Sequence, residues 1–386
     1  MSMNTDVRNV RVAWLLPIAW FYWQPVLSEF TRLFPETTVF TGLFPGFAKG
    51  YENSLTVELV GEIKVVGLTK SKTGYGDNFT YLSPAIIGCL LRLKPDIVFT
   101  SSFGIWTLLA VLLKPIGRWR VVIAYEGCSP GVDYRNSLLR LMLRRILVAA
   151  TDACITNSHA GKAYLTEFLK AKANEVFVEP YEIPVPEAFS LIEGSAEQGH
   201  KSLNHPIFLF VGHIVPRKGL NFLLEACAIL RAQGYSDYTV LVVGDGSQQE
   251  ELKAFCESHD LVNCIKWEGR VEYDLIGSYF QMADVFVLPT LEDTWGVVVL
   301  EAMLFGKPIL CSKGAGTSEL IEHGENGYVF EPQDSETLAK LMRQLIDDPQ
   351  LMVAMGEKSK QVMAQYTPLS ASKTLAEVTE FALAER

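Results

Sequence analysis

Short apolar runs alternate with longer segments of helical periodicity along the first half of the chain. Runs rich in β-branched and aromatic residues predict buried strands, and apolar residues spaced by three and four predict helices. The predicted strands are 10–16, 38–41, 63–68, 96–101, 121–125, 153–157 and 176–179. The predicted helices are 84–93, 105–113, 137–149 and 160–168.

The same alternation restarts after a break marked by Pro180, Pro184, Pro186 and Pro206. Strands are predicted at 207–211, 239–243, 264–267, 285–288, 308–311 and 328–330, and helices at 220–231, 248–256, 297–304 and 337–346. Continuous apolar strands separated by helices are typical of parallel sheets that are covered on both faces. The chain is therefore predicted to be an α/β protein with two doubly wound domains.

The predicted boundaries follow from this break. Residues 1–182 form the first domain, 183–206 the linker and 207–365 the second domain, and 366–386 form a C-terminal helix that packs back on the first domain. Ligands of such sheets bind beyond the carboxyl ends of the strands. We therefore expect the two domains to face a central cleft.

Composition narrows the class of protein. The chain has 386 residues, 49% of them hydrophobic and 20% charged, as in folded globular proteins. Its longest apolar runs, 14–23 and 103–113, are shorter than the ~20 residues of a membrane span. Arg8 and Arg11 precede the first run as in a secretion signal, but no small-residue cleavage site follows, which favours a first strand. Seven scattered cysteines without a C-x-x-C pair indicate a reducing, cytoplasmic location and neither a disulfide framework nor a zinc site.

The net charge of −10 hides two opposite halves. Residues 1–182 hold 19 Lys and Arg against 15 Asp and Glu, a net charge of +4, whereas the remainder holds 15 against 29, a net charge of −14. The basic excess suggests that the first half faces an anionic partner, and acidic surface helices in the second half explain the asymmetry equally well. Nucleic acid is not expected, because the chain lacks a basic stripe with aromatic stacking platforms.

Two motifs follow the first two strands of the second domain. Arg217 and Lys218 stand at a strand-to-helix turn, where Arg acts as a planar fork and Lys as a point charge on phosphate oxygens. The alternative is a solvated surface loop. Gly244, Asp245 and Gly246 follow the next strand and suit either close approach to a ligand or a plain turn.

The segment 289–303 carries the most information. A strand ends at Pro289, an acidic loop follows, and a helix begins near Gly296, whose amides and dipole suit a diphosphate. Glu301 lies inside this helix among apolar neighbours, so its carboxylate needs partners, and two sugar hydroxyls would serve. A partly exposed position on the helix edge is the alternative. In a further Gly-rich turn, Thr317 or Ser318 either caps a helix or lies where the backbone amides face phosphate.

Together these motifs resemble the retaining glycosyltransferases of family 4, which are group 1 glycosyltransferases with the GT-B fold. The resemblance rests on the ordered set Gly-x-x-x-Pro-Arg-Lys-Gly at 212–219, Gly-Asp-Gly at 244–246, Trp-Glu-Gly-Arg-Val at 267–271, Glu-Ala-Met at 301–303 and the segments 317–321 and 324–330. It covers 207–345, and in residues 1–180 it rests on architecture and on segment 152–158.

The resemblance implies two Rossmann-like domains, with a nucleotide-diphosphate sugar bound mostly by the second and with no metal or other cofactor. Arg217 and Lys218 match cations that neutralise the diphosphate, Glu301 matches a ribose-binding carboxylate, and Arg270 and Val271 lie where the backbone touches the base. The implied donor-binding residues are Gly212, His213, Arg217, Lys218, Asp245, Arg270, Val271, Thr294, Trp295, Gly296, Val297 and Glu301. The implied catalytic residues are Glu126, Asp293, Glu292, Lys218 and Arg217.

Three positions depart from the family pattern. His213 replaces a frequent phosphate-binding Arg, so the clamp depends more on the adjacent Arg-Lys pair. Asp293 replaces a Glu that faces the donor sugar, and the neighbouring Glu292 could serve instead. Glu126 falls where many members place a His-Gly, which makes it the catalytic candidate of the first domain.

The first domain is expected to shape the acceptor site. Trp20, Tyr22 and Trp23 follow the first strand and suit either sugar rings and lipid or the protein core. The stretch from Arg135 to Ile146 interleaves arginines with Leu and Met, as in helices that lie on anionic membranes. A core helix whose arginines reach solvent at its edge is the alternative.

The expected activity is metal-independent transfer of a sugar, with retention at its anomeric carbon, to a glycan, lipid-linked or small-molecule acceptor. A GT-B sugar-nucleotide epimerase or hydrolase and a non-catalytic sugar-nucleotide-binding relative remain alternatives. A periplasmic sugar-binding protein shares the two-domain α/β plan, but it would need an export signal and an oxidising compartment.

Overall fold

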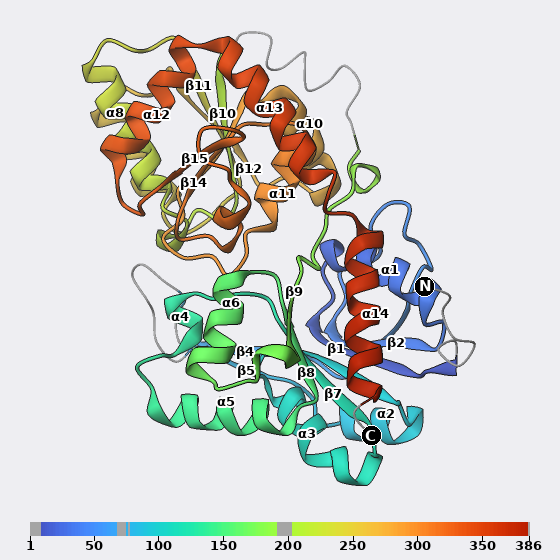
Figure 1. Cartoon of the computed structure of the whole chain (residues 1–386). Coiled ribbons are helices and arrows are strands. Elements are labelled where there is room, and N and C mark those ends of the chain that lie inside the picture. The colour runs from blue at the N-terminus through green and yellow to red at the C-terminus, as the bar shows by residue number, and fades with distance from the viewer. Residues whose placement is uncertain (1–8, 68–74, 76–77, 191–202, 385–386) are drawn as a thin grey trace. The chain divides into compact units, whose positions relative to one another are not determined.

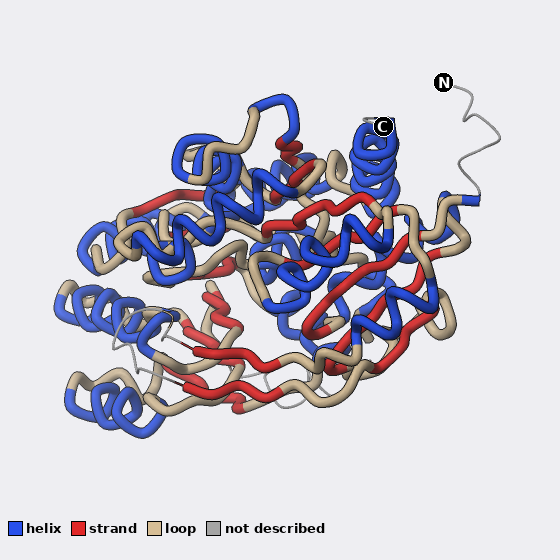
Figure 2. Tube along the Cα trace, turned by 90° about the horizontal axis from the view of Figure 1, so that it is seen from below, coloured by secondary structure: helices blue, strands red, loops and turns tan. Residues whose placement is uncertain are grey.

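The computed structural model describes residues 9–67, 75, 78–190 and 203–384, which form two compact units (Figure 1). The first unit comprises Met1–Lys70, Gly76–Ile183 and Tyr366–Arg386, and the second comprises Ser71–Tyr75 and Pro184–Gln365. In each unit helices pack along the strands (Figure 2). The two units are described separately below.

The first unit is built on a seven-stranded sheet of order β3-β2-β1-β6-β7-β8-β9, in which all neighbouring strands are parallel. Its core forms because the central strands are apolar throughout: Val12 to Leu16 are at most 1% exposed, as expected of a sheet covered on both faces. The strands are β1 (Val12–Ile18), β2 (Thr37–Leu43), β3 (Thr56–Leu59), β6 (Ile97–Ser101), β7 (Arg120–Tyr125), β8 (Ala153–Thr156) and β9 (Val176–Val178).

Helices from both ends of the chain cover this sheet. They are α1 (Gln24–Leu33), α2 (Ile86–Leu93), α3 (Ile105–Gly117), α4 (Pro130–Asp133), α5 (Leu138–Ala150), α6 (His159–Ala163) and α14 (Pro368–Ala384). The last of these, α14, packs against α1 (Figure 1). Residues that follow the second unit in sequence therefore complete the first.

One predicted strand of the first unit lies outside the seven-stranded sheet. Segment 63–68 was predicted to join the parallel sheet, but β4 (Lys64–Gly67) pairs antiparallel with β5 (Asn78–Tyr81) in a separate two-stranded sheet. The edge position belongs instead to β3, which pairs with β2. The sequence of β3, Thr-Val-Glu-Leu, is partly exposed and alternates in polarity, so it lacks the continuous apolar run of a central strand.

The second unit contains a six-stranded parallel sheet of order β12-β11-β10-β13-β14-β15. The strands are β10 (Ile207–Val211), β11 (Thr239–Val243), β12 (Ile265–Gly269), β13 (Val285–Leu288), β14 (Ile309–Ser312) and β15 (Gly327–Phe330). The helices are α8 (Leu220–Ala232), α9 (Gln249–Ser258), α10 (Ile276–Met282), α11 (Val297–Leu304), α12 (Ser335–Asp347) and α13 (Pro349–Met363). The predicted α/β class with parallel sheets is confirmed.

None of the helices in the described part of the chain is long and apolar enough to cross a membrane. All seven cysteines are free thiols, and all but Cys128 are buried.

Candidate functional site

Three loops of the second unit lie together beyond the carboxyl ends of β10, β13 and β14. The backbone N–H of Leu291 and the hydroxyl of Thr290 both donate to the carbonyl oxygen of Arg217, at 2.8 and 3.0 Å. The N–H of Asp293 donates to the carbonyl oxygen of Gly314 at 2.8 Å. The loops that carry three of the sequence motifs are therefore joined through their backbones.

Close backbone contacts at this edge require glycine. Gly219 has φ +66°, and a side-chain carbon added there would lie 2.1 Å from the carbonyl oxygen of Pro289. Gly244 has φ +135°, and an added carbon would lie 2.0 Å from the carbonyl oxygen of Gly212. A larger residue at either position would push the loops apart, so both glycines set the geometry of the site.

A cluster of charged side chains lies at the centre of these loops. Lys218 forms an ion pair with Asp293, and Nη1 of Arg217 lies 3.9 Å from Oδ2 of the same carboxylate. Arg217 Nη1 also donates to the carbonyl oxygen of Glu292 at 2.7 Å. The three charged side chains are at most 17% exposed. Two largely buried cations share the Asp293 carboxylate, and an anionic ligand could take its place beside them.

Tyr75 also belongs to this cluster, and sequence analysis did not identify it. The guanidinium of Arg217 lies 4.1 Å from the centre of its ring. The N–H of Thr294 donates to its hydroxyl at 3.4 Å, and its own N–H donates to Oε2 of Glu292 at 3.3 Å. Burial, reinforced by the nearby Asp293, raises the pKa of Tyr75 to about 12, so the residue is a neutral phenol at physiological pH. A single tyrosine outside any periodic segment gives no sequence signal.

Glu301 lies on α11 and is 5% exposed, so the predicted burial of this carboxyl group is confirmed. Its Oε1 accepts a hydrogen bond from the hydroxyl of Tyr273 at 3.0 Å. Burial raises the pKa of Glu301 to about 7, and the Tyr273 hydrogen bond opposes this rise only in part. Glu301 therefore changes charge near neutral pH. Tyr273, which the sequence did not single out, is its hydrogen-bond partner.

The start of α11 lies beside this cluster. Gly296 precedes the helix with φ +91°, and no side chain caps the helix start. Val297 is half-buried in its first turn, whereas Trp295 is 2% exposed and packs under Gly316, where an added carbon would lie 3.1 Å from its ring. Of these predicted donor residues, Trp295 is therefore buried and packs against the loop at Gly316.

The remaining predicted donor residues lie in the loops after β10, β11 and β12. His213 and Arg270 are exposed, and Val271 is half-buried. His213 Nδ1 lies 4.0 Å from Oδ1 of Asp245. These loops are linked by the N–H of Gly244, which donates to a carbonyl oxygen at the end of β12 at 2.7 Å.

The predicted residues of the first unit lie at the carboxyl ends of its strands. Glu126 follows β7 and is half-buried. Trp20 is exposed and Tyr22 is half-buried, whereas Trp23 is 2% exposed and stacks on Tyr181 with 5.2 Å between ring centres. Trp23 therefore belongs to the core of the unit, whereas Trp20 and Tyr22 reach its surface.

A buried carboxylate organises the loop that follows Glu126. Asp133 is fully buried and accepts hydrogen bonds from the hydroxyl of Tyr125 at 2.5 Å, the thiol of Cys128 at 2.8 Å and the N–H of Ser129 at 3.3 Å. Its charge is paired with Arg135 at 2.8 Å. Burial and hydrogen bonding to Asp133 raise the pKa of the Cys128 thiol to about 12, which excludes a reactive thiolate at neutral pH.

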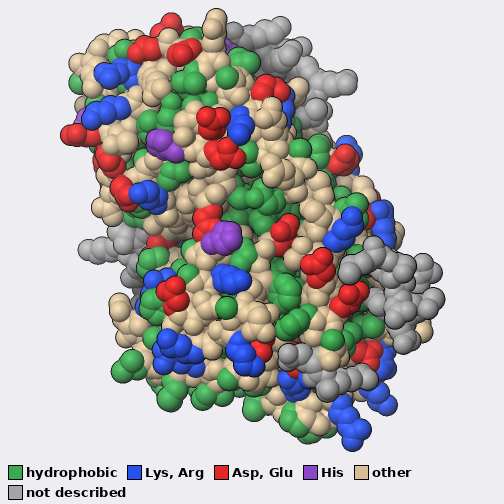
Figure 3. Space-filling model, viewed as in Figure 1, with side chains coloured by type: hydrophobic (Ala, Val, Ile, Leu, Met, Phe, Trp, Pro, Cys, Tyr) green, Lys and Arg blue, Asp and Glu red, His purple; other side chains and the backbone are tan. Residues whose placement is uncertain are grey.

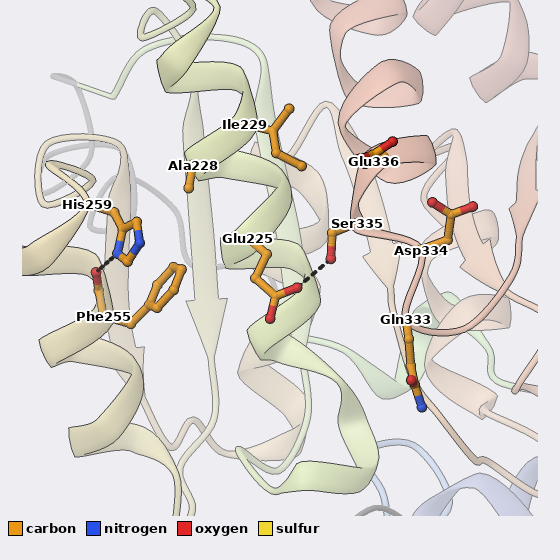
Figure 4. A pocket seen from close by; sticks show the side chains of 9 residues that line it. All are labelled: Glu225, Ala228, Ile229, Phe255, His259, Gln333, Asp334, Ser335 and Glu336. Atoms are coloured by element: carbon orange, nitrogen blue, oxygen red, sulfur yellow. Dashed lines mark hydrogen bonds between the residues drawn. The ribbon is translucent and has the colours of Figure 1, made fainter.

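Figure 4 shows a pocket of about 430 Å³ on the second unit, between α8, α9 and the start of α12. Glu225, Asp334 and Glu336 line it, and no Lys or Arg does. One of these carboxylates, Glu225, accepts a hydrogen bond from Ser335 at 2.7 Å. An anionic diphosphate would be repelled there, so this pocket does not compete with the charged cluster as a nucleotide site. Within the described residues, no group of three or more His, Cys, Asp or Glu side chains could hold a metal ion.

The sequence of the second unit is similar to a known protein family. Residues 193–362, which include the charged cluster except for Tyr75, match the family described as glycosyl transferases group 1. The match covers most of the second unit and less than half of the chain. This match agrees with the resemblance that the sequence motifs show.

Curated proteins similar to this chain include an uncharacterized glycosyltransferase of Haemophilus influenzae, which is 29% identical over 234 residues, 60% of this chain and 62% of that protein. The sulfoquinovosyl transferase of Arabidopsis thaliana is 26% identical over 298 residues, 74% of this chain and 56% of that protein. The chain thus matches less than two thirds of the length of these curated relatives.

Solved structures extend the comparison to the first unit. HepE from Anabaena, solved with UDP, is similar with a TM-score of 0.74 at 18% sequence identity, covering 96% of this chain and 100% of that chain. At this identity the likeness shows the fold alone. The predicted GT-B fold is confirmed.

Proposed function

We propose that the chain transfers a sugar from a nucleotide-diphosphate sugar to an acceptor hydroxyl, with retention at the anomeric carbon and without a divalent metal. The observation that carries this proposal is the buried Arg217–Lys218 pair beside the start of α11. It supplies two cations at the carboxyl edge of the sheet, where such folds bind ligands. HepE, which shares the fold, has been solved with UDP-glucose, in keeping with a donor of this class.

The chief chemical task is to stabilise a leaving diphosphate. The bond between the anomeric carbon and the diphosphate oxygen breaks, the acceptor oxygen bonds to the same face of the sugar, and its proton passes to the leaving diphosphate. Lys218, Arg217 and the uncapped amides of α11 then face the growing negative charge. Groups that are already oriented lower the barrier without reorganising.

The Asp293 carboxylate lies beside both cations. A bound diphosphate would compete for Lys218 and release the Asp293 carboxylate toward the sugar, where it can accept hydrogen bonds from hydroxyls. Glu292 is the second candidate for that role. Its Oε2 accepts the backbone N–H of Tyr75 in this structure.

The first unit is proposed to bind the acceptor. Trp20 and Tyr22 reach its surface, and Glu126 stands at the end of β7 on a loop fixed by the buried Asp133. Glu126 is the residue proposed to contact the acceptor or the reacting carbon. Glycan, lipid-linked and small-molecule acceptors all present the hydroxyl that this reaction needs.

The proposal is tested by screening nucleotide sugars for binding and then for turnover. A donor at ~100 times its Kd is expected to add ~2.7 kcal/mol to the free energy of unfolding, which a thermal shift detects. Turnover of that donor is expected only with an acceptor present. Consumption without an acceptor would instead identify an epimerase or hydrolase, and binding without turnover a non-catalytic relative. If no nucleotide sugar raises the melting temperature, the proposal is wrong.

The same assay tests metal independence. Because two side-chain cations and helix amides meet the diphosphate charge, EDTA is expected to leave the rate unchanged. A complete loss of activity with EDTA that manganese restores would contradict this part of the proposal.

The ring of Tyr75 covers the Arg217 guanidinium, so the donor must displace this contact when it binds. The contact contributes ~0.5–1 kcal/mol. Tyr75→Ala should therefore bind UDP more tightly, with a Kd about two- to fivefold lower than that of the wild type. Tyr75→Phe retains the ring and should leave the Kd close to that of the wild type. Isothermal titration of UDP measures both. A weaker affinity in Tyr75→Ala would show that the ring supports the nucleotide.

A further inference from the structure

The first unit exposes an unusual number of large apolar side chains on two helices. The described residues expose seventeen such side chains, and eight of them lie on α3 and α5. They are Leu108, Leu112, Ile116, Leu138, Leu139, Met142, Leu143 and Ile146, each between 42% and 84% exposed. Single exposed leucines need no explanation, but a concentration of this kind marks an interaction surface.

The spacing of these residues places them in two stripes. Leu108, Leu112 and Ile116 follow one another at intervals of four along α3. The exposed residues of α5 after Leu138 fall at 139, 142, 143 and 146, which is the spacing of one helix face. The opposite side of α5 is buried through Leu141, Leu147 and Val148. Each helix therefore has one face in the core and one apolar face in solvent.

The two helices pack side by side. The ammonium group of Lys114, late in α3, donates to the carbonyl oxygen of Ala150 at the end of α5, at 3.0 Å. The guanidinium of Arg144, in the middle of α5, lies 4.8 Å from the ring centre of Phe103, just before α3. The stripes thus belong to one surface, which we call the α3–α5 face. Hydrophobic and basic side chains gather along the edge that α3 and α5 form in the lower part of Figure 3.

The charges of the α3–α5 face have one sign. Neither helix contains an Asp or Glu, whereas α5 contributes Arg140, Arg144 and Arg145, and Arg118 caps the end of α3. Arg118 and Arg145 are exposed. The nearest acidic residues in sequence are neutralised, because Asp133 pairs with Arg135, and Asp152 pairs with Lys114 and Arg120. An apolar face whose two helices carry only cationic charges complements an anionic surface.

We propose that the α3–α5 face binds an anionic lipid membrane, with its apolar side chains inserted between headgroups and its arginines on lipid phosphates. An amphipathic helix with this composition lies in the membrane interface. Each cation near an anionic leaflet contributes ~1 kcal/mol, about fivefold in affinity. A second copy of the chain fits less well, because a twofold interface would bring like charges together. This proposal does not depend on the transferase reaction. The sequence pattern indicated only the part from Arg135 to Ile146.

The test is co-sedimentation of the full chain with vesicles. Binding is expected to vesicles of equal phosphatidylglycerol and phosphatidylcholine, but not to phosphatidylcholine alone, and it should weaken between about 50 and about 500 mM salt. Leu112→Asp and Leu143→Asp place a charge at exposed positions, so the fold should survive and the bound fraction should fall at least fivefold. Val353→Asp, at a 69% exposed position on α13, is the matched control and should bind as the wild type does.

Several outcomes would overturn the proposal. One is that the wild type shows no binding to anionic vesicles at low salt, and another is that both Leu→Asp variants bind as strongly as the wild type does. A third such outcome is that Val353→Asp reduces the bound fraction as much as the Leu→Asp variants do. Sedimentation velocity without lipid tests whether a second copy of the chain binds the α3–α5 face instead. A concentration-dependent dimer that Leu112→Asp abolishes, without vesicle binding, would assign the face to a second copy of the chain. Because vesicle binding is measured without substrate, a failed transferase assay leaves its result intact.

Discussion

Replacing Lys218 by alanine is expected to lower kcat by about two to three orders of magnitude, which corresponds to ~2.7–4 kcal/mol of barrier. Lys218 is the largely buried ammonium group that pairs with Asp293 and is proposed to meet the leaving diphosphate. Its contribution grows as charge develops, so kcat should fall more than KM rises. Steady-state kinetics with the donor found by the screen measures both quantities.

A matched control separates this effect from a general loss of charge. Lys313 lies just after β14, pairs with Glu331 and keeps a 58% exposed side chain. Lys313→Ala should retain wild-type turnover. The Lys218 variant should keep a cooperative melting transition, since Arg217 still lies 3.9 Å from Asp293. A folded Lys218→Ala protein with kcat within threefold of the wild type would exclude the proposed site.

Donor affinity is expected to depend on pH through Glu301. Its pKa is raised to about 7, so the carboxyl group is neutral below that pH and ionised above it. We propose that Glu301 accepts hydrogen bonds from the ribose hydroxyls of the donor, so binding favours the ionised form. As the pH falls, the Kd of a nucleotide sugar should change little down to pH 7 and then rise about tenfold per pH unit. The total increase between pH 8 and pH 5.5 should be about 30-fold. A nucleotide sugar suits this measurement because its diphosphate stays ionised over that range.

Glu301→Gln provides the control, because the amide keeps an oxygen for the Tyr273 hydroxyl but cannot ionise. Its donor affinity should be weak and independent of pH. The variant also has an expected effect on stability. A carboxyl group with a raised pKa in the folded state stabilises the protein fully below its unfolded pKa of 4.5 and loses that contribution as the pH rises through 7, about 3 kcal/mol in all. Glu301→Gln should thus melt higher than the wild type at pH 8. A steep pH dependence that persists in the variant would assign the titration to another group.

The central strands of the second unit could be predicted well from the sequence. Segments 207–211, 239–243 and 285–288 coincide with β10, β11 and β13, because each is a short, wholly apolar run between polar turns. A strand buried on both faces leaves this signal without help from the rest of the fold.

Strands at the margins of the first unit could not be predicted in the same way. β3 is half-exposed and alternates in polarity, so its four residues resemble a loop. β4 has the composition of a strand, but its partner and its antiparallel direction depend on where β5 lies in space. Pairing is a tertiary property, and local apolar pattern does not encode it.

The candidate site shows the same division between local and tertiary information. The Arg-Lys pair, the acidic loop and Glu301 stand in recognisable motifs at a strand end or in a helix, so the sequence could single them out, and the family resemblance implied their roles. Tyr75 and Tyr273 contact Arg217 and Glu301, respectively, from segments with no recognisable pattern. Their importance comes from the group each one touches, and only the folded chain brings those groups together.

The return of α14 to the first unit determines how that unit could be produced in isolation. Its residues are not contiguous in the gene, because 366–386 are translated after the whole second unit. A fragment that ends at Ile183 would leave the α14-facing side of α1 uncovered and should aggregate on expression. Fusing residues 366–384 behind Ile183 through a flexible spacer should yield a soluble fragment, on which the proposed binding of acceptors can be tested without the second unit.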